Sequence, residues 1–329
     1  MKILPSFEKG YDPKEYLEIR SSENCTRVLV QKKDLLELIK SGSNQDLSSL
    51  IDLPERNSTN DAEVDEWRRF NWGESLEYYQ WSRRSEFYDS KVDSEERLTS
   101  QKELIQKYIK NVGEIPLPRQ LSNDNHAISL DKYSGAIPIC TFGDALVERS
   151  CSKHSSKSTL KLDEMSSILF HSFSDIRKHR IPKEGKGLMS DVLKSFGRSF
   201  EFYLVVYDPE LIASGIYFFD PVSHSIKMGK AGEYRSEMVD ILIGHSAPKT
   251  ASCSLIMVQE FEISQWQYKH ERALRNLYFE VGRIMQRILV AASYYRKNTH
   301  ITPACKDSEA TKLLDLSESQ QVFYTITLA

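Results

Sequence analysis

Two short groups of polar residues have the types and spacing that chemistry would need. In the first group, Tyr268 and Lys269 stand side by side, and Arg272 and Arg275 follow at intervals of three. Lysine and tyrosine have ordinary pKa values of about 10.4 and about 10, so either acts as a general base only when its surroundings lower that pKa. Neighbouring arginines provide such surroundings. A helix N-terminus decorated with polar residues is the commoner explanation of a run like this one.

The second group contains Arg149, Ser150, Cys151 and Lys153. Arg149 and Lys153 are four residues apart, and two cations at that spacing suit the two charges of a phosphate group better than neutral side chains would. In most proteins such a pair is part of a solvated surface. The phosphate interpretation therefore depends on the rest of the chain.

A long helix is predicted to organise the C-terminal half. Between Trp266 and Lys297, apolar residues recur at intervals of three and four, which is the period of an α-helix with one broad apolar face. These residues are Leu274, Leu277, Tyr278, Val281, Ile284, Met285, Ile288, Leu289 and Ala292. At a rise of about 1.5 Å per residue the helix would be roughly 40 Å long. A helix of this kind is a central scaffold or a dimer interface unless other residues give it a chemical role.

Strands and helices are interleaved in the rest of this half. Strands are predicted at 200–207, in a hairpin at 215–228 that turns at Asp220-Pro221, at 254–262 and at 321–328, with helices at 160–170, 233–245 and near 314. The chain contains no G-x-G-x-x-G motif and no regular βαβ alternation. These patterns predict an α+β fold.

Three regions are predicted along the chain. Residues 1–60 are expected to form a small N-terminal helical module that also contains a short β-like run, TRVLV. Residues 61–135 are expected to form an aromatic-rich connecting segment, of which the charged, proline-punctuated part is interpreted as a linker. Residues 136–329 are expected to form the main domain.

Composition excludes several classes of function. The chain has 329 residues, with 44 basic and 47 acidic side chains and a net charge of -3, so neither nucleic acid nor an anionic membrane is expected as a partner. No run approaches the roughly 18 apolar residues of a membrane span, and the N-terminus lacks the apolar core of a secretory signal. Five scattered cysteines without a C-x-x-C pair argue against a metal site and a disulfide framework. We therefore expect a cytoplasmic protein without a metal.

The motifs together resemble one enzyme family. A pair of tyrosine and lysine before Arg-x-x-Arg, followed by Glu280-Val281-Gly282 and Gln286, is similar to the signature of the SagB-type, or thiazole/oxazole-forming, dehydrogenases, a branch of the FMN-dependent nitroreductase family. The family has Lys-Tyr where this chain has Tyr268-Lys269. The phosphate motif R-x-S-x-R/K is matched except that Cys151 replaces serine. The resemblance extends over roughly residues 67–329 and includes Ser195 and Gly197.

This resemblance implies a fold and a cofactor site. The fold would be nitroreductase-like, an antiparallel-rich sheet wrapped by helices with a long dimer-interface helix, and FMN would lie at the subunit boundary with residues from both chains. The implied cofactor-binding residues are Arg149, Ser150, Cys151, Lys153, Ser195, Gly197, Ala304 and Cys305. The implied catalytic residues are Lys269 and Tyr268. We favour Lys269, because on one continuous helix it would share a face with Arg272 and Arg275.

The implied activity is FMN-dependent oxidation of azoline rings to azoles on a peptide or a carrier-bound substrate. A cyclodehydratase would be a partner, and the chain would form a homodimer or a heterodimer with a paralogue. Two alternatives stay open: an NAD(P)H-dependent nitro or quinone reductase, and a catalytically degenerate partner subunit of a biosynthetic complex. Four departures from the family keep the degenerate alternative open: the reversed Tyr268-Lys269 pair, Cys151, the missing proline before Ser195, and Arg283 where the helix often has histidine.

Overall fold

A computed structural model of the chain describes the main domain almost completely and the N-terminal region in part. The described residues are 2–5, 16–21, 26–31, 33, 69–70, 72–82, 99, 103, 106, 110, 116–121, 124–131, 141–149, 160–181, 196–268 and 272–329. They divide into two compact units. The first comprises Met1–Val92 with Tyr268–Leu274, and the second comprises Asp93–Gln267 with Arg275–Ala329.

The first unit contains a small antiparallel sheet and one described helix. The elements are β1 (Lys2–Pro5), β2 (Tyr16–Ser21), β3 (Thr26–Gln31) and α3 (Gly73–Trp81), and the strand order is β1-β2-β3. The TRVLV run is a strand as expected, and β1 and β2 are two further strands that were not predicted. The helical part of the expected module at residues 1–60 stays a prediction. Apart from Lys33, which is helical, the helical patterns predicted after β3 lie outside the described residues.

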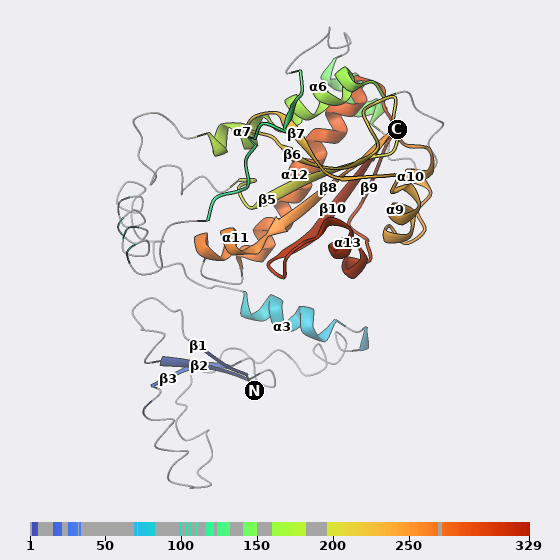
Figure 1. Cartoon of the computed structure of the whole chain (residues 1–329). Coiled ribbons are helices and arrows are strands. Elements are labelled where there is room, and N and C mark those ends of the chain that lie inside the picture. Colours follow the sequence, from blue (N-terminus) through green and yellow to red (C-terminus); the bar gives the residue numbers. More distant parts are fainter. Residues whose placement is uncertain are drawn as a thin grey trace. The chain divides into compact units, whose positions relative to one another are not determined.

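The second unit is built on a fully antiparallel seven-stranded sheet with the order β4-β7-β6-β5-β8-β10-β9 (Figure 1). The strands are β4 (Ile128–Ser129), β5 (Phe200–Val206), β6 (Gly215–Asp220), β7 (Ser225–Ala231), β8 (Cys253–Glu260), β9 (Thr299–Thr302) and β10 (Gln320–Leu328). The helices are α5 (Phe142–Glu148), α6 (Leu162–Ser172), α7 (Ser174–Arg180), α9 (Arg235–Ile241), α10 (Ala247–Thr250), α11 (Phe261–Gln267), α12 (Ala273–Tyr294, entering from the first unit) and α13 (Asp307–Leu314).

The predicted hairpin turns where the sequence indicated. The carboxylate of Asp220 accepts hydrogen bonds from the Val222 amide at 2.8 Å and from the Ser223 hydroxyl at 2.7 Å, which closes the turn between β6 and β7. It also accepts the Leu121 amide at 2.8 Å. Leu121 and Leu130 are buried, and β4 pairs with β7. Residues 116–121 and 124–131, part of the segment interpreted as a linker, therefore pack on the sheet.

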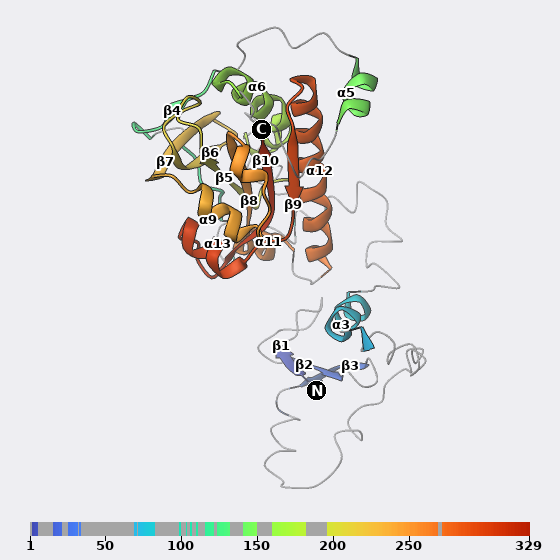
Figure 2. The ribbon, with the colours of Figure 1, turned by 90° about the vertical axis from the view of Figure 1, so that its right-hand side faces the viewer.

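Helices cover both faces of the sheet. Figures 1 and 2 show α6, α7 and α12 on one face, which we call the α12 face, and α9 and α13 on the other, which we call the α13 face. On the α12 face, the ring of Phe173 packs edge-on against Phe202 and Phe219 at 4.5 and 5.3 Å between centroids. On the α13 face, Tyr203 and Phe218 belong to a buried apolar cluster with side chains of α9 and α13. These two layers form the core.

The long helix is shorter than predicted. A helix ends at Gln267 and α12 begins at Ala273, so one continuous helix from Trp266 to Lys297 is wrong. The sequence between Gln267 and Ala273, YKHER, is mostly polar and contains few apolar side chains that would favour packing of a helical turn against the core. From Leu277 onward the prediction of the buried face is confirmed, because Leu277, Val281, Ile284, Met285, Ile288, Leu289 and Ala292 are buried. Tyr278 is exposed.

In the described part of the chain, no helix is both long enough and apolar enough to cross a membrane. The domain limits at residues 60 and 135 remain predictions.

Candidate functional site

Gly197 lies in the turn just before β5, at the edge of the α12 face. Its φ of +67° is in the left-handed region that glycine tolerates best. A Cβ at this position would stand 2.5 Å from Cγ1 of Ile176, which is buried. Both the backbone conformation and the close approach of α7 therefore require a glycine here.

Two charged side chains hold the backbone of this turn. Glu280 on α12 accepts a hydrogen bond from the Gly197 amide at 3.0 Å, and Arg180 on α7 donates to the Gly197 carbonyl at 2.6 Å and to the Phe200 carbonyl. Burial raises the pKa of Glu280 and lowers the pKa of Arg180 to about 10. We call Gly197, Ile176, Glu280 and Arg180 the Gly197 clamp. The buried charges of Glu280 and Arg180 thus hold one short turn of backbone in place.

Sequence reasoning found only part of this clamp. Gly197 and Glu280 stood out through the family resemblance, but Glu280 was given no role. Arg180 was missed, because the run SDIRKHR reads as a polar helix and nothing in it shows which arginine is buried. Only the fold brings Arg180 to the turn.

Arg149, the described member of the predicted phosphate group, lies directly after α5. Its amide donates to the Ala145 carbonyl at 3.1 Å, and that carbonyl also accepts the hydroxyl of Ser293 at 2.9 Å. A capping box starts α5, with the Asp144 amide donating to the Thr141 hydroxyl at 3.1 Å. Arg149 is therefore held, half-buried, near the C-terminal end of α12.

One chain does not bring Arg149 and Gly197 together. Along α12, Glu280, which holds Gly197, and Ser293, which holds α5, are thirteen positions apart. At about 1.5 Å per residue, these two contacts are roughly 20 Å apart on the helix.

Ala304 and Cys305 lie between β9 and α13, where the Ala304 amide donates to the Thr302 hydroxyl at 3.0 Å. Cys305 packs against the buried cluster of the α13 face. Burial first, and then Asp307, raise the pKa of the Cys305 thiol to about 12, so the thiol is neutral. This loop is thus on the opposite face of the sheet from the Gly197 clamp.

The remaining predicted residues are only partly described. Ser150, Cys151, Lys153, Ser195 and Lys269 lie outside the described residues. Tyr268 is half-buried and lies between α11 and α12, outside any helix. The continuous helix on which the choice of Lys269 depended is thus interrupted, and the role of Lys269 stays a prediction.

The segment that carries Tyr268 is attached to the aromatic-rich part of the first unit. The guanidinium of Arg272 donates to the Ser82 carbonyl at 3.2 Å, just after the end of α3. Ser82 is itself buried, and its hydroxyl donates to the Tyr79 carbonyl at 3.2 Å. The α3 segment thus positions the predicted catalytic segment.

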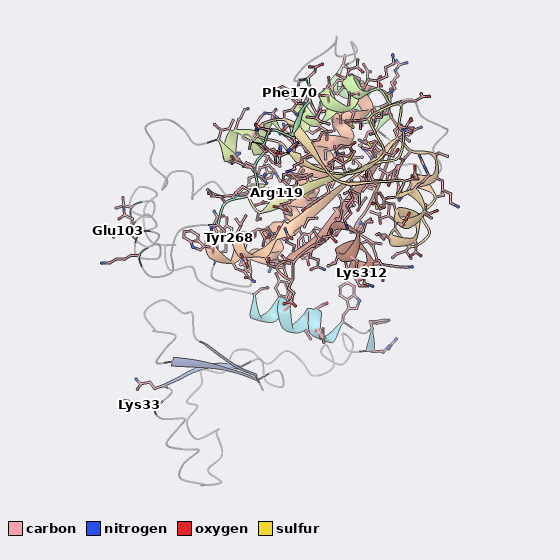
Figure 3. All side chains as sticks on the ribbon, in the orientation of Figure 1. Lys33, Glu103, Arg119, Phe170, Tyr268 and Lys312 are labelled. Carbon is pink, nitrogen blue, oxygen red and sulfur yellow. The ribbon has the colours of Figure 1, made fainter. Side chains whose placement is uncertain are left out.

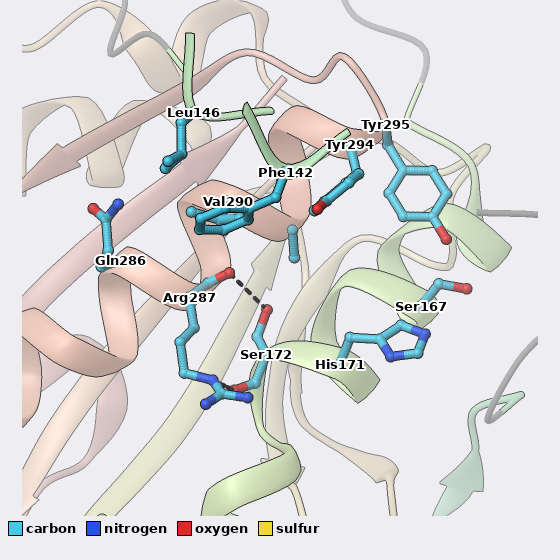
Figure 4. A pocket seen from close by; sticks show the side chains of 11 residues that line it. Phe142, Leu146, Ser167, His171, Ser172, Gln286, Arg287, Val290, Tyr294 and Tyr295 are labelled. Atoms are coloured by element: carbon cyan, nitrogen blue, oxygen red, sulfur yellow. Dashed lines mark hydrogen bonds between the residues drawn. The ribbon is translucent and has the colours of Figure 1, made fainter. Parts of the chain in front are cut away.

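A largely apolar cavity of about 600 Å³ lies between α5, α6 and α12 (Figure 4). Arg287 closes one side, donating to the Ser172 carbonyl at 2.9 Å and to the Ser174 hydroxyl at 2.7 Å. Phe142 and Leu146 line the cavity and are also exposed to solvent. Of the described residues predicted to bind the cofactor, none lines this cavity. Its exposed apolar rim suits contact with another protein surface better than it suits the phosphate of a cofactor.

The described residues agree in chemistry with an FMN site. The half-buried Arg149, directly after α5, offers a charge-assisted hydrogen bond to phosphate, whereas the missing Cβ of Gly197 makes room for Ile176. Among the described residues, no group of three His, Cys, Asp or Glu side chains is placed to hold a metal ion.

Solved structures share this architecture. A candidate nitroreductase from Anabaena variabilis aligns with a TM-score of 0.50 at 17% identity, over 68% of this chain and 46% of that one. Another from Ralstonia eutropha gives a TM-score of 0.48 at 14% identity, over 66% and 94%. A chain of the E. coli microcin synthetase McbBCD complex, solved with truncated pro-MccB17 bound, gives 0.42 at 14% identity, over 74% and 98%. The last two scores are too low to support a conclusion. The predicted nitroreductase-like α+β fold is confirmed.

One sequence relative is informative. The trifolitoxin operon protein TfxC of Rhizobium leguminosarum bv. trifolii is 23% identical over 220 residues, which cover 64% of this chain and 62% of TfxC. The match thus spans less than two thirds of this relative's length. No family model matches the chain. The chain is a nitroreductase-fold protein and a distant homologue of TfxC.

Proposed function

We propose that the chain is an FMN-dependent dehydrogenase that oxidises thiazoline or oxazoline rings to azoles on a peptide or carrier-bound substrate. The observation that carries this proposal is the Gly197 clamp, because the turn that matches the flavin loop of the family is fixed by Glu280 and Arg180. The similarity to TfxC and the motif around Tyr268 support the azoline-oxidising branch.

In this proposal two chains share each cofactor site. Arg149 and Lys153 would hold the FMN phosphate, and Ser195 and Gly197 would contact the ring. Since one chain keeps Arg149 and Gly197 roughly 20 Å apart along α12, a second copy or a paralogue would supply the missing half. The exposed apolar side chains Phe142 and Val147 on α5 suit such an interface.

The chain's own residues would orient the substrate and take a proton. When bound, FMN supplies the hydride acceptor. The azoline ring loses a hydride from one ring carbon to FMN and a proton from the adjacent atom to a base. Tyr268 or Lys269 would be that base, held in place by the bond from Arg272 to the α3 segment. Loss of one hydride and one proton converts the azoline into the aromatic azole.

A second candidate is a catalytically degenerate partner subunit. The Tyr268-Lys269 pair stands in reversed order, and the predicted helix is interrupted between Gln267 and Ala273. Such a subunit would keep the fold and the interface without turnover. A nitro or quinone reductase of the same fold is the third candidate, and it would use NAD(P)H as its donor.

The visible spectrum of the purified protein separates these candidates. We expect a flavin spectrum, either on purification or after reconstitution with FMN. A flavin-loaded protein that is reduced by an azoline peptide supports the dehydrogenase, and one reduced only by NADH or NADPH supports the reductase. A colourless protein that cannot be reconstituted supports the degenerate subunit. Adding the cyclodehydratase that makes the azoline tests the proposed partner.

A further inference from the structure

A second cavity, of about 510 Å³, lies on the α13 face of the sheet, opposite the Gly197 clamp. Its size is within the roughly 300–1,000 Å³ typical of small-molecule pockets. Phe218 pairs with Lys227 and Ile216 pairs with Lys230 across β6 and β7, so both lysines lie on the same face as the two apolar residues. Leu313 and Leu314 at the end of α13 complete its apolar wall.

Glu201 contributes a buried carboxylate to this cavity. The side chain is 8% exposed, and the Tyr203 hydroxyl and the Gln320 amide both donate to its Oε2 atom, at 3.0 and 3.1 Å. No residue in the described part of the chain donates to Oε1. Burial raises the pKa of this carboxyl. A carboxylate buried this deeply is normally paired with a cation or fully hydrogen-bonded.

Arg119 contributes the opposite charge. Its guanidinium carbon lies 4.4 Å from the centre of the Phe218 ring, and the nearby Leu121 amide anchors its segment on Asp220 at 2.8 Å. The two lysines of the cavity have acidic partners, Lys227 with Asp124 at 2.6 Å and Lys230 with Asp315 at 2.8 Å. Within the described ranges, Arg119 has no ion pair. Arg119 and Glu201 attract each other across the cavity, but no ion pair joins them directly, so a ligand with both charges has room to lie between them.

We propose that this cavity binds a free α-amino acid with an apolar side chain. The carboxylate of the ligand would sit on Arg119, whose planar donors match a carboxylate, and its ammonium would donate to Oε1 of Glu201. The apolar side chain would pack against Ile216, Leu313 and Leu314. A single zwitterion would bridge these two opposite charges. This site is independent of FMN and of the proposed dehydrogenase activity.

Calorimetric titration of the full-length protein tests the proposal with matched ligands. Leucine, methionine and phenylalanine are the amino-acid probes, while 4-methylpentanoate and 3-methylbutylamine keep the leucine side chain but lack the ammonium or the carboxylate. We expect at least one amino acid to bind, and leucine to bind roughly tenfold or more tightly than either analogue, because each analogue loses one charge-assisted hydrogen bond. Equal affinity for leucine and 4-methylpentanoate would overturn the role of Glu201.

Two variants test which residue binds each charged group of the ligand. Arg119→Ala should weaken leucine and 4-methylpentanoate alike, whereas Glu201→Gln should weaken leucine and leave 4-methylpentanoate unchanged. Lys312→Ala, which removes an exposed α13 lysine paired with Glu309, is the control and should change nothing (Figure 3). Arg119 is exposed, so its variant should fold even if Glu201→Gln does not. No binding of the three amino acids at millimolar concentration would show that Glu201 only links β5 to β10 and would end the proposal.

Discussion

The carboxylate of Glu280 accepts the amide of Gly197 at 3.0 Å, joining the middle of α12 to the turn before β5. The same turn is held from its carbonyl side by Arg180, which is 8% exposed. Burying a charged side chain is costly unless the charge is hydrogen-bonded. Neutral side chains could hold an ordinary turn without this cost. This arrangement supports the interpretation that the turn at Gly197 has a functional position to keep.

The first prediction concerns the fit of Gly197. Gly197→Ala should destabilise the fold by more than Gly244→Ala, which is the matched control because Gly244 has a φ of +78° but nothing within 4 Å of its Cβ position. Both changes carry the left-handed backbone penalty of about 1–2 kcal/mol. Gly197→Ala adds overpacking against buried Ile176, which costs about 1–3 kcal/mol more. Denaturant unfolding measures both variants, and equal losses would contradict the close contact.

The second prediction concerns pH. Burial raises the pKa of Glu280 above its ordinary value of 4.5, so the folded state holds this proton more tightly than the unfolded state does. The desolvation cost is absent below about pH 4.5 and fully present above the raised pKa, so this group makes the folded state less stable as pH rises through that window. Glu280→Gln removes the effect.

Unfolding free energies of the wild type and of Glu280→Gln should be compared at a series of pH values. We expect the difference, wild type minus variant, to fall as pH rises from about 4.5. Glu309→Gln, at an exposed acid on α13, should show no such trend. A pH-independent difference for Glu280→Gln would mean that burial does not perturb this carboxyl.

Sequence patterns predicted the elements of the main domain better than their junctions. The hairpin at Asp220, the strand β8 and the buried face of α12 follow from periodicity and turn residues, and the structure confirms them. The end of a helix at Gln267 was missed. Apolar periodicity shows which face of a helix is buried, but it does not show whether the helix is continuous. The strands β1 and β2 were missed as well, since KILP and YLEIRS are too short to carry a clear alternation.

The candidate site was less predictable than the fold. Gly197 was found through its motif, but its partner Arg180 becomes identifiable only when α7 packs beside the turn. The separation of Arg149 from Gly197 could not be read from the sequence, because it depends on which ends of α12 they contact. Spacing along the chain gives no measure of that distance.

The third prediction concerns the FMN phosphate. Arg149→Ala combined with Lys153→Ala should weaken FMN binding by roughly 100- to 10,000-fold, because two charge-assisted hydrogen bonds to a dianion are lost. The paired control is Lys178→Ala with Lys312→Ala, which removes the same charge from side chains that are 76% and 75% exposed. Flavin content after gel filtration is the measurement. Stoichiometric FMN in the first double variant would show that the phosphate lies elsewhere.

The fourth prediction concerns assembly. Val147 on α5 is 86% exposed, and Phe142 is also exposed on this helix. We expect a dimer, or a heterodimer with a paralogue, that Val147→Glu disrupts by placing a charge in the interface. Ile181→Glu, at an exposed apolar residue after α7, should leave the mass unchanged. Light scattering reports the mass, and a flavin-loaded wild-type monomer at micromolar concentration would refute the shared site.

The fifth prediction concerns the base. Lys269→Ala should keep FMN bound while slowing azoline oxidation by roughly 10²–10⁴-fold, the usual loss when a general base is removed. Tyr268→Phe should cost much less. A large loss in Tyr268→Phe alone would exchange the two roles, and small equal losses would mean that the pair has become structural.

The most direct test of the proposed activity is a single turnover without oxygen, in which FMN-loaded protein is mixed with a thiazoline-containing peptide. The dehydrogenase account predicts that the visible absorbance of the oxidised flavin disappears while the peptide loses two hydrogens in equal amount, and that Lys269→Ala slows both changes together. A flavin that stays oxidised with the thiazoline peptide, with or without the cyclodehydratase, but is reduced by NADH would contradict it.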